Sequence, residues 1–312
     1  MPTVVIIGNR ADAHAKAVLD ALSQYDVSVS ILDLETLPQL DYEWSDQGFR
    51  TRQNASEKWR SWEDGTRGWI RRISPPFWQA GIAIESVEAA ETTAWLALLG
   101  GIARTAPVRW LTPIDPLLVS ENKLLQSSTA RTLGISYPRT VVTSERNVVD
   151  ESLEFPVVLK PLGPSHFFGE KGAHIVYAQE ALADSDALLH LSGAPFIVQE
   201  RLQAVRHWRL VTVARQSWGA YLDASDRPLD WRADATAHHS FNTGRVPDQI
   251  ASGALAVASA LGLGYSSQDW VETADDYYLL DVNPGGQWLF LPEPVATDVT
   301  SRIASWLARR DD

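Results

Sequence analysis

Three oxygen-bearing side chains near the end of the chain carry the clearest chemical signal. Asp281 and Asn283 lie in the stretch "DVNPGGQW", directly after the apolar run "YYLL", and Asp269 lies in the earlier run "YSSQDWVE". Residues two apart on a strand share a face, so Asp281 and Asn283 are expected to project together. If the two runs pair as a hairpin across "TADD", Asp269 joins them at a cross-strand spacing of about 5 Å.

Such a set of side chains suits a magnesium ion, because two carboxylates and an amide carbonyl are hard oxygen ligands. A partly hydrated Mg²⁺ held in this way commonly bridges the phosphates of a substrate. A second interpretation stays open at this point: Asp281 and Asn283 can simply shape a turn before Pro284.

Two lysines form a second candidate group. Lys123 stands at the start of a predicted helix, and Lys160 ends the otherwise apolar strand "FPVVLKPL". A lysine on an apolar strand is costly to bury without an anion, and phosphate oxygens are suitable partners for its point charge. The alternative for Lys160 is a position at a sheet edge, from which the ammonium group reaches solvent.

The elements that must position these residues begin with a strand, a helix and a strand in "TVVII", "AHAKAVLDALSQY" and "VSVSIL", which predicts a parallel α/β unit. Only Gly8 lies at the first turn, and a dinucleotide-binding fingerprint needs several glycines there, so this unit is interpreted as a scaffold. A helix follows in "ESVEAAETTAWLALLGGI", with acids in its first turns and with Gly100 and Gly101 expected to end it.

Strands and helices of ordinary length fill the rest of the chain. A helix from a Ser120 cap to Gly134 precedes the strands in "RTVVTS" and "FPVVLKPL", a helix from about Glu180 to Leu191 and the strand in "PFIVQERL". The last third predicts a hairpin in "WRLVTVARQSWGAYLD", a helix in "DQIASGALAVASALGLG", the hairpin that carries the acidic residues, and a terminal amphipathic helix.

Composition limits the function classes. A chain of 312 residues exceeds what one hydrophobic core usually serves, so two or three subdomains are expected. The lack of cysteine excludes disulfides, thiolate metal sites and a cysteine nucleophile, and it fits a reducing cytoplasm. The net charge of -12 argues against nucleic-acid or anionic-membrane partners, and no stretch predicts a signal peptide or a transmembrane helix. We therefore expect a soluble, cytoplasmic protein.

Taken together, the motifs resemble those of ATP-grasp ligases, and most closely the graspetide synthetases, the microviridin-type peptide macrocyclases. The resemblance runs over nearly the whole chain in "ENKLLQ", "LGISYP", "FPVVLKPL", "FIVQERL", "LDWR", "YSSQDW" and "DVNPGGQW", and "WIRR" and "NPGGQWLFL" are similar to more specific patterns of that subfamily. It implies an α/β fold class: an ATP-grasp fold with an N-terminal pre-ATP-grasp domain at 1–115, a central subdomain at 116–195 and a C-terminal subdomain at 196–312 with the metal site.

The resemblance implies roles at the nucleotide for each matching residue. Lys123 and Lys160 match the lysines that hold the ATP phosphates, and the loop from Gly163 to Gly172 matches a flexible cover over them. The linker that hydrogen-bonds to adenine and packs against it is matched by Gln199, Glu200 and Leu202.

The magnesium ligands are matched by Asp269, Asp281 and Asn283, with Asp281 at a position where a longer glutamate is usual. His207 stands where related synthetases carry an acidic residue near the ribose, so the ribose contact is unassigned.

Four arginines also lie in the matching motifs or beside them. Arg209 and Arg232 match recurrent arginines near the acyl phosphate and are the catalytic candidates, with a structural ion pair as the alternative for each. Arg71 and Arg72, in "WIRR", have either a functional or a surface role.

The activity that this resemblance implies uses ATP and Mg²⁺ to activate an Asp or Glu side chain of a precursor peptide as an acyl phosphate. A Ser, Thr or Lys side chain then attacks, which closes an ester or amide ring. The expected partner is a precursor peptide with a leader sequence, and a homodimer stays open. Two rivals remain: a RimK-like ligase that acts on free amino acids or a protein terminus, and a nucleotide-binding regulator without turnover.

Overall fold

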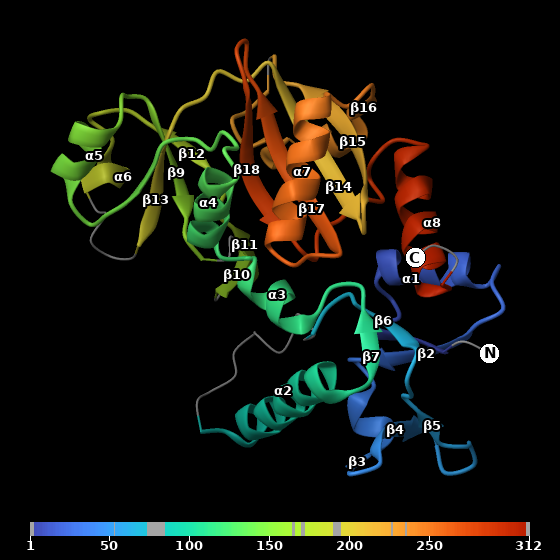
Figure 1. The fold of residues 1–312 in the computed structure, drawn as a ribbon. Helices are drawn as coiled ribbons and strands as arrows, with labels where there is room; N and C mark the ends of the chain where they lie inside the picture. Colours follow the sequence, from blue (N-terminus) through green and yellow to red (C-terminus); the bar gives the residue numbers. More distant parts are fainter. Residues whose placement is uncertain are drawn as a thin grey trace.

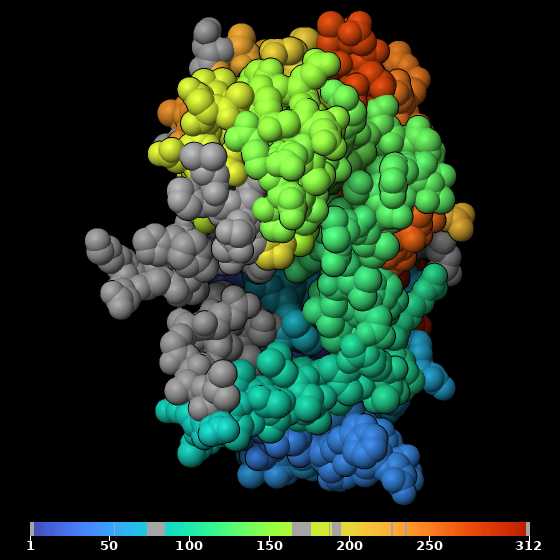
Figure 2. Space-filling model, turned by 90° about the vertical axis from the view of Figure 1, so that its left-hand side faces the viewer, coloured from blue at the N-terminus to red at the C-terminus, as the bar shows by residue number. Residues whose placement is uncertain are grey.

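The computed structural model describes residues 3–52, 54–73, 85–163, 166–169, 172–189, 195–225, 227–234 and 236–309. Figure 1 shows the N-terminal third of the chain below, and the central and C-terminal sheets side by side above it. Figure 2 shows that the surface is hollowed between the green residues from the middle of the chain and the teal residues below them.

The N-terminal sheet is parallel throughout and has the strand order β2-β1-β6-β7. Its strands are β1 (Thr3–Gly8), β2 (Ser28–Asp33), β6 (Thr66–Ile70) and β7 (Val108–Trp110). Helix α1 (Ala13–Leu22) connects β1 to β2, and the Asp12 carboxylate caps it by accepting from two backbone N–H groups of the first turn. The predicted parallel α/β unit is confirmed.

A short 3-10 helix and a small antiparallel sheet separate β2 from β6. They are η1 (Leu37–Gln39), β3 (Asp41–Ser45), β4 (Gly48–Arg52) and β5 (Arg60–Ser61). Phe49 of β4 packs edge to face on the buried ring of Trp62, which ties this sheet to the core of the N-terminal unit.

Helix α2 (Val87–Thr105) runs through both glycines that were expected to end it, so the predicted end at Gly100 and Gly101 is wrong. Residues on both sides of the glycines are buried in one core cluster: Leu99, Ile102 and Ala103. This packing outweighs the roughly 1 kcal/mol that each glycine costs in a helix interior.

Helix α4 (Lys123–Thr132) begins at Lys123 as expected, but its cap is Asn122 rather than Ser120. The Asn122 side-chain oxygen accepts from two backbone N–H groups of the first turn, at 3.0 and 3.1 Å. Ser120 instead ends the preceding short helix α3 (Ile114–Val119).

The central sheet has the strand order β12-β9-β13-β8, with antiparallel neighbours. Its elements are β8 (Thr140–Val142), α5 (Arg146–Ser152), β9 (Val157–Pro161), β12 (Gln179–Ala181), α6 (Asp186–Leu189) and β13 (Phe196–Glu200), and a hairpin of β10 (His166–Gly169) and β11 (Gly172–Ile175) follows β9. The predicted helix start at Glu180 is wrong, because Glu180 pairs with β9, and residues 190–194 lie outside the described residues.

The C-terminal sheet is antiparallel and has the strand order β16-β15-β14-β17-β18. Its strands are β14 (Arg206–Val213), β15 (Gln216–Asp223), β16 (Asn242–Thr243), β17 (Tyr265–Glu272) and β18 (Tyr277–Asn283), with the 3-10 helices η4 (Trp231–Ala233) and η5 (Ala237–His239) before β16. Both predicted hairpins, β14 with β15 and β17 with β18, are confirmed.

Helices α7 (Asp248–Ala260) and α8 (Val295–Leu307) cover opposite faces of this sheet. On β14, Leu210 packs in the cluster around α7 and its neighbour Val211 in the cluster around α8, as strand alternation requires. The α8 cluster also holds residues of β1, so the N-terminal and C-terminal sheets share one core. No helix in the described part of the chain is long and apolar enough to cross a membrane.

The strand pairing bears on the domain boundaries. Strand β13 pairs with β8 and β9, which favours a boundary after Glu200 rather than at 195/196, whereas α4 contacts β18 and α7 of the C-terminal part. The division into three parts stays a prediction.

The junction of the N-terminal unit with the C-terminal sheet gives a test of the fold. A methyl group added at Gly264 would lie 1.7 Å from the carbonyl oxygen of Leu111. Gly264→Ala is therefore expected to lower the free energy of unfolding by about 3 kcal/mol, because backbone atoms cannot yield as a side chain can. Urea denaturation followed by tryptophan fluorescence measures this loss.

Gly101→Ala is the matched control. The added methyl group meets no described atom within 4 Å, and alanine favours a helix interior by about 0.5 to 1 kcal/mol. A Gly264→Ala protein as stable as the wild type would contradict the close approach at Leu111.

Candidate active site

A cavity of about 840 Å³ lies between the central sheet, the C-terminal sheet and the residues that follow β6. All the residues predicted to hold nucleotide or metal line it: Lys123, Lys160, Gln199, Glu200, Leu202, Asp269, Asp281 and Asn283. Arg232 lines the cavity as well, whereas Arg209 is not part of its wall. Residues far apart in the chain thus form one continuous surface.

The two carboxylates expected to bind metal face each other across β17 and β18, where Asp269 is the Cα partner of Asp281. Each is held by a cation: Asp281 Oδ1 accepts from Lys123 Nζ at 2.7 Å, and Asp269 Oδ1 accepts from Arg209 Nη1 at 2.8 Å. Burial alone would raise the pKa of Asp281, but Lys123 and other nearby cations keep that pKa below its usual range. Asp281 is therefore ionised.

This donor set fits a partly hydrated Mg²⁺. The second oxygen of each carboxylate makes no hydrogen bond to the described residues. Asn283 Oδ1 accepts from the backbone N–H of Gly285 at 3.0 Å and keeps a lone pair. Within the described residues no three of the types His, Cys, Asp and Glu lie together as a metal cluster, so a metal here would complete its shell with water or phosphate oxygens, as Mg²⁺ does.

Lys160 reaches the cavity from the end of β9, and its Nζ donates to Gln199 Oε1 at 2.7 Å. Gln199 is fixed in turn, because its Nε2 donates to Thr140 Oγ1 at 2.8 Å. The amide therefore orients Lys160 without neutralising it. Burial lowers the pKa of Lys160 to about 8, and the charge of Lys123 acts in the same direction.

Glu200 and Leu202 continue the wall beyond Lys160. The Glu200 carboxylate accepts from the backbone N–H and from Nε of Arg139, at 2.8 and 2.9 Å, so its side chain is committed to holding the end of β13. The N–H of Glu200 already donates to the carbonyl of Arg139, and the carbonyl of Leu202 accepts from the side chain of Arg201. The backbone N–H and the apolar side chain of Leu202 are therefore what this stretch offers to a base, for hydrogen bonding and for packing.

Both predicted catalytic arginines make ion pairs. Arg232 donates from Nε and Nη2 to the two oxygens of Asp230, at 2.8 and 2.6 Å, and this pairing raises the pKa of Arg232. Asp230 also accepts from the backbone N–H of Ala178 at 3.1 Å. Arg232 is thus a fixed charge on the wall, whereas Arg209 is nearly buried beside Asp269 and acts on the cavity through that carboxylate.

Two other predicted features lie at the rim. His207 lines the cavity, and burial lowers its pKa, which favours the neutral ring. The loop from Gly163 to Gly172 contains strand β10, while residues 164–165 and 170–171 lie outside the described residues. The role of this loop as a moving cover stays a prediction.

Gln126 is a positioning residue that the sequence motifs did not single out. It is fully buried on α4, its Oε1 accepts from the backbone N–H of Val282 at 3.0 Å, and its Nε2 donates to the Val282 carbonyl at 2.8 Å. Strand β18 is the last in its sheet, so the N–H and carbonyl of Val282 have no partner on a further strand. Gln126 satisfies both groups, between Asp281 and Asn283.

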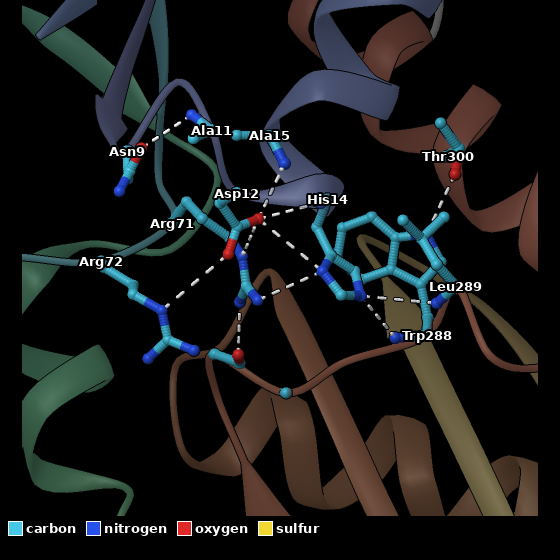
Figure 3. A network of polar contacts seen from close by, with 12 residues as sticks. Asn9, Ala11, Asp12, His14, Ala15, Arg71, Arg72, Trp288, Leu289 and Thr300 are labelled. Carbon is cyan, nitrogen blue, oxygen red and sulfur yellow. Dashed lines mark hydrogen bonds and ion pairs between the residues drawn. The ribbon is translucent and has the colours of Figure 1, made fainter. Parts of the chain in front are cut away.

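A buried polar network joins the N-terminal unit to the loop after β18 (Figure 3). Arg71 donates from Nε to Asp12 at 3.1 Å and from Nη1 to the carbonyl oxygen of Gly285. His14 Nε2 accepts from the backbone N–H of Trp288 at 3.2 Å, and burial lowers the pKa of His14, which keeps the ring neutral and able to accept. Since Arg71 is only 3% exposed, the alternative of a surface role for it is wrong.

The fold resembles that of solved structures along nearly the whole chain, although no protein-family model matches the sequence. The chain is 25% identical over 206 residues to the tetrahydromethanopterin:alpha-L-glutamate ligase of Methanocaldococcus jannaschii, a match that covers 62% of this chain and 68% of that protein. The structure of the macrocyclase MdnC from Microcystis aeruginosa MRC, bound with its precursor peptide MdnA, is similar with a TM-score of 0.82 at 20% identity, and the match covers 98% of this chain and 99% of MdnC.

Two other solved structures extend the likeness. A RiPP-associated ATP-grasp ligase of Chryseobacterium gregarium, in complex with ADP and a leader and core peptide, matches with a TM-score of 0.86 at 19% identity over 100% of this chain and 98% of that one. The ATP-grasp ligase PsnB, complexed with a minimal precursor, Mg and ADP, matches with a TM-score of 0.76 at 16% identity over 98% and 97%. The protein therefore has the ATP-grasp fold with its N-terminal α/β domain, as expected.

The lowered pKa of Lys160 gives a test of its role. Below a pH of about 8 the lysine is already charged, whereas above it phosphate binding must restore the charge, so nucleotide binding should take up a proton and weaken as the pH rises. Calorimetry with ADP and Mg²⁺ at a pH of about 8.5, in two buffers of different ionisation enthalpy, measures the uptake.

Lys160→Arg is the control, because arginine stays charged throughout this range and should remove most of the uptake. Equal proton uptake by the two proteins would show that Lys160 does not meet the phosphates.

The two hydrogen bonds between the Gln126 side chain and the Val282 backbone give a second test. Gln126→Leu keeps the size of the side chain but leaves a buried N–H and a buried carbonyl without partners, which should lower the free energy of unfolding by roughly 2 to 4 kcal/mol. Urea denaturation measures this, and calorimetry of Mg²⁺ with ADP should show weaker binding. Gln249→Leu, at an exposed glutamine that donates to Asp276, should change neither by much.

Proposed function

We propose that the protein is an ATP-dependent ligase that joins a carboxylate of a precursor peptide to a hydroxyl or amine of the same peptide. The carboxylate belongs to an Asp or Glu side chain and the nucleophile to a Ser, Thr or Lys side chain, so the products are ester or amide rings. ATP is converted to ADP and phosphate.

The observation that carries this proposal is the concentration of four kinds of groups on one cavity wall. Lysines suited to phosphate, oxygen ligands suited to Mg²⁺ and a fixed arginine all line it, and the strand end at Glu200 and Leu202 offers a surface for a base. The full-length likeness to MdnC and to the Chryseobacterium gregarium ligase supports a peptide substrate, because both were solved with peptides bound.

The chain's own residues bind the phosphates and stabilise the charge that develops in the reaction. Lys123 and Lys160 bind phosphate oxygens of ATP, and the substrate carboxylate oxygen attacks the γ-phosphorus while the bond to ADP breaks. The nucleophile then attacks the acyl carbon, the carbon–oxygen bond to phosphate breaks, and the proton of the nucleophile leaves with the released phosphate. Arg232 stabilises the negative charge that develops at the acyl phosphate. Asp269, Asp281 and Asn283 would hold Mg²⁺, which when bound would supply further charge neutralisation at the phosphates.

A second candidate is a ligase that adds an amino acid to an acceptor. The match to a glutamate ligase of Methanocaldococcus jannaschii favours it, since the same cavity would serve the same acyl-phosphate chemistry. The two candidates differ in product mass, because ring closure removes water from one peptide whereas addition increases the mass of the acceptor.

The test uses the purified protein with ATP, Mg²⁺ and its cognate leader-bearing precursor peptide. Mass spectrometry is expected to show the peptide lighter by one water per ring, with one ADP formed per ring. Asp281→Asn should reduce ADP formation by about 100-fold or more, because it removes a charged metal ligand and the partner of Lys123.

Removal of the leader should sharply reduce conversion while ADP binding stays unchanged, because the leader supplies affinity away from the reacting carboxylate. An acceptor that gains the mass of an amino acid, with no effect of the leader, would instead establish the second candidate.

A further inference from the structure

One arginine of the cavity differs from the others in its bonding. Three of the four arginines on the wall donate to carboxylates at 2.6 to 2.8 Å: Arg201 to Glu180, Arg227 to Asp234 and Arg232 to Asp230. Arg72 makes no side-chain hydrogen bond within the described residues, and its nearest carboxylate oxygen, Asp12 Oδ2, lies 4.0 Å from its Nε (Figure 3). Its guanidinium donors are therefore available to a ligand.

The backbone of Arg72 is nevertheless held firmly. It follows Arg71, whose side chain is 1% exposed and anchors to Asp12 and Gly285, whereas the side chain of Arg72 is 44% exposed. Both backbone N–H groups donate to the carbonyl of Ile7, at 2.8 and 3.4 Å. One arginine thus fixes the chain, and the next projects from this fixed point onto the cavity wall.

The neighbours of Arg72 define what it can bind. Lys123, Asp281 and Asn283, the groups assigned to phosphate and metal, line the same cavity, and Arg72 enters it from the N-terminal unit. Burial and the charge of Arg71 lower the pKa of Arg72, while Asp12 and Glu121 act in the opposite direction, and arginine stays charged at any working pH. A charged fork with unused donors beside the phosphate end of the cavity suits a carboxylate, which it can bind through two parallel hydrogen bonds.

We propose that Arg72 binds the carboxylate that the enzyme activates, and so selects a substrate with an acidic side chain. The inference rests on the proposed function for the identity of the reaction, and on the bonding of Arg72 for the assignment. Arg72 holds the carboxylate beside the phosphates until an oxygen of that carboxylate attacks the γ-phosphorus and the bond from that phosphorus to ADP breaks.

The test separates carboxylate binding from turnover. Glutarate, a small dicarboxylate, is titrated into the protein saturated with ADP and Mg²⁺, so that the phosphate-binding lysines are already engaged, and binding is followed by ligand-observed NMR. Wild type should bind glutarate at least ~10-fold more tightly than the uncharged glutaramide, and Arg72→Met should lose at least ~10-fold of the glutarate affinity, the range of a charge-assisted hydrogen bond. Arg72→Lys should recover part of it.

Arg104→Met is the matched control, because the side chain of Arg104 is 45% exposed against 44% for Arg72, but it lies on α2 and is bound to Asp115. It should bind glutarate and ADP as the wild type does. The affinity for ADP should also stay within about 2-fold in Arg72→Met, and with the precursor peptide the same variant should raise KM by ~10- to 100-fold.

Each contrary outcome has one meaning. Equal binding of glutarate and glutaramide by the wild type, or unchanged glutarate affinity in Arg72→Met, overturns the assignment of Arg72. Loss of ADP affinity in Arg72→Met with glutarate binding intact overturns it too, in favour of a phosphate contact. If the wild type binds glutarate through Arg72 but forms no ring in the peptide, the proposed function fails while the carboxylate site stands.

Discussion

Two carboxylates that face each other on neighbouring strands impose the main constraint on this structure. Asp269 and Asp281 are Cα partners, and like charges placed directly opposite destabilise a sheet unless cations compensate them. Arg209 compensates one from the next strand, and Lys123 compensates the other from the first turn of α4. The strand order β14-β17-β18 brings Arg209 beside Asp269, and the packing of α4 against β18 brings Lys123 beside Asp281. Both features of the fold are therefore needed for two carboxylates to lie together in this site.

The N-terminal unit belongs to the same arrangement, because the backbone after β18 lacks strand partners of its own. Buried backbone groups must find partners elsewhere, and here they find them on Arg71 and His14, which bind the carbonyl of Gly285 and the N–H of Trp288. Gly286 permits this loop to pass close to the sheet, since an added methyl group there would meet Ser267 at 2.5 Å. The N-terminal α/β unit, which the sequence predicted to be a scaffold, thus also shapes the site.

The features predictable from sequence are those that neighbouring residues determine. The hairpin of β17 and β18 followed from alternation and a short turn. The facing positions of Asp269 and Asp281 also need the register shift between Asp269 and Trp270, because a regular ladder would place Leu280 opposite Asp269. Gln126 and Arg71 could not be found in this way, because their partners lie 156 and 214 positions away, and neither glutamine on a helix nor a double arginine has a spacing that predicts such a contact. The end of α2 failed for a related reason, since distant core packing outweighed a local helix-ending signal.

The ion pairs also suggest how the site couples its two ligands. Lys123 is neutralised by Asp281, so it can turn fully to a phosphate only when another cation replaces it at that carboxylate. Lys160 is hydrogen-bonded to an uncharged amide, and burial and the charge of Lys123 lower its pKa, so a phosphate beside it stabilises its charged form. A nucleotide that arrives with a divalent cation supplies phosphate to the two lysines and a cation to Asp281 at once. The nucleotide alone would leave Asp281 without a cation, and the metal alone would leave Lys123 without an anion. We therefore expect positive coupling between nucleotide and metal, with a common origin in the pairing of Asp281 with Lys123.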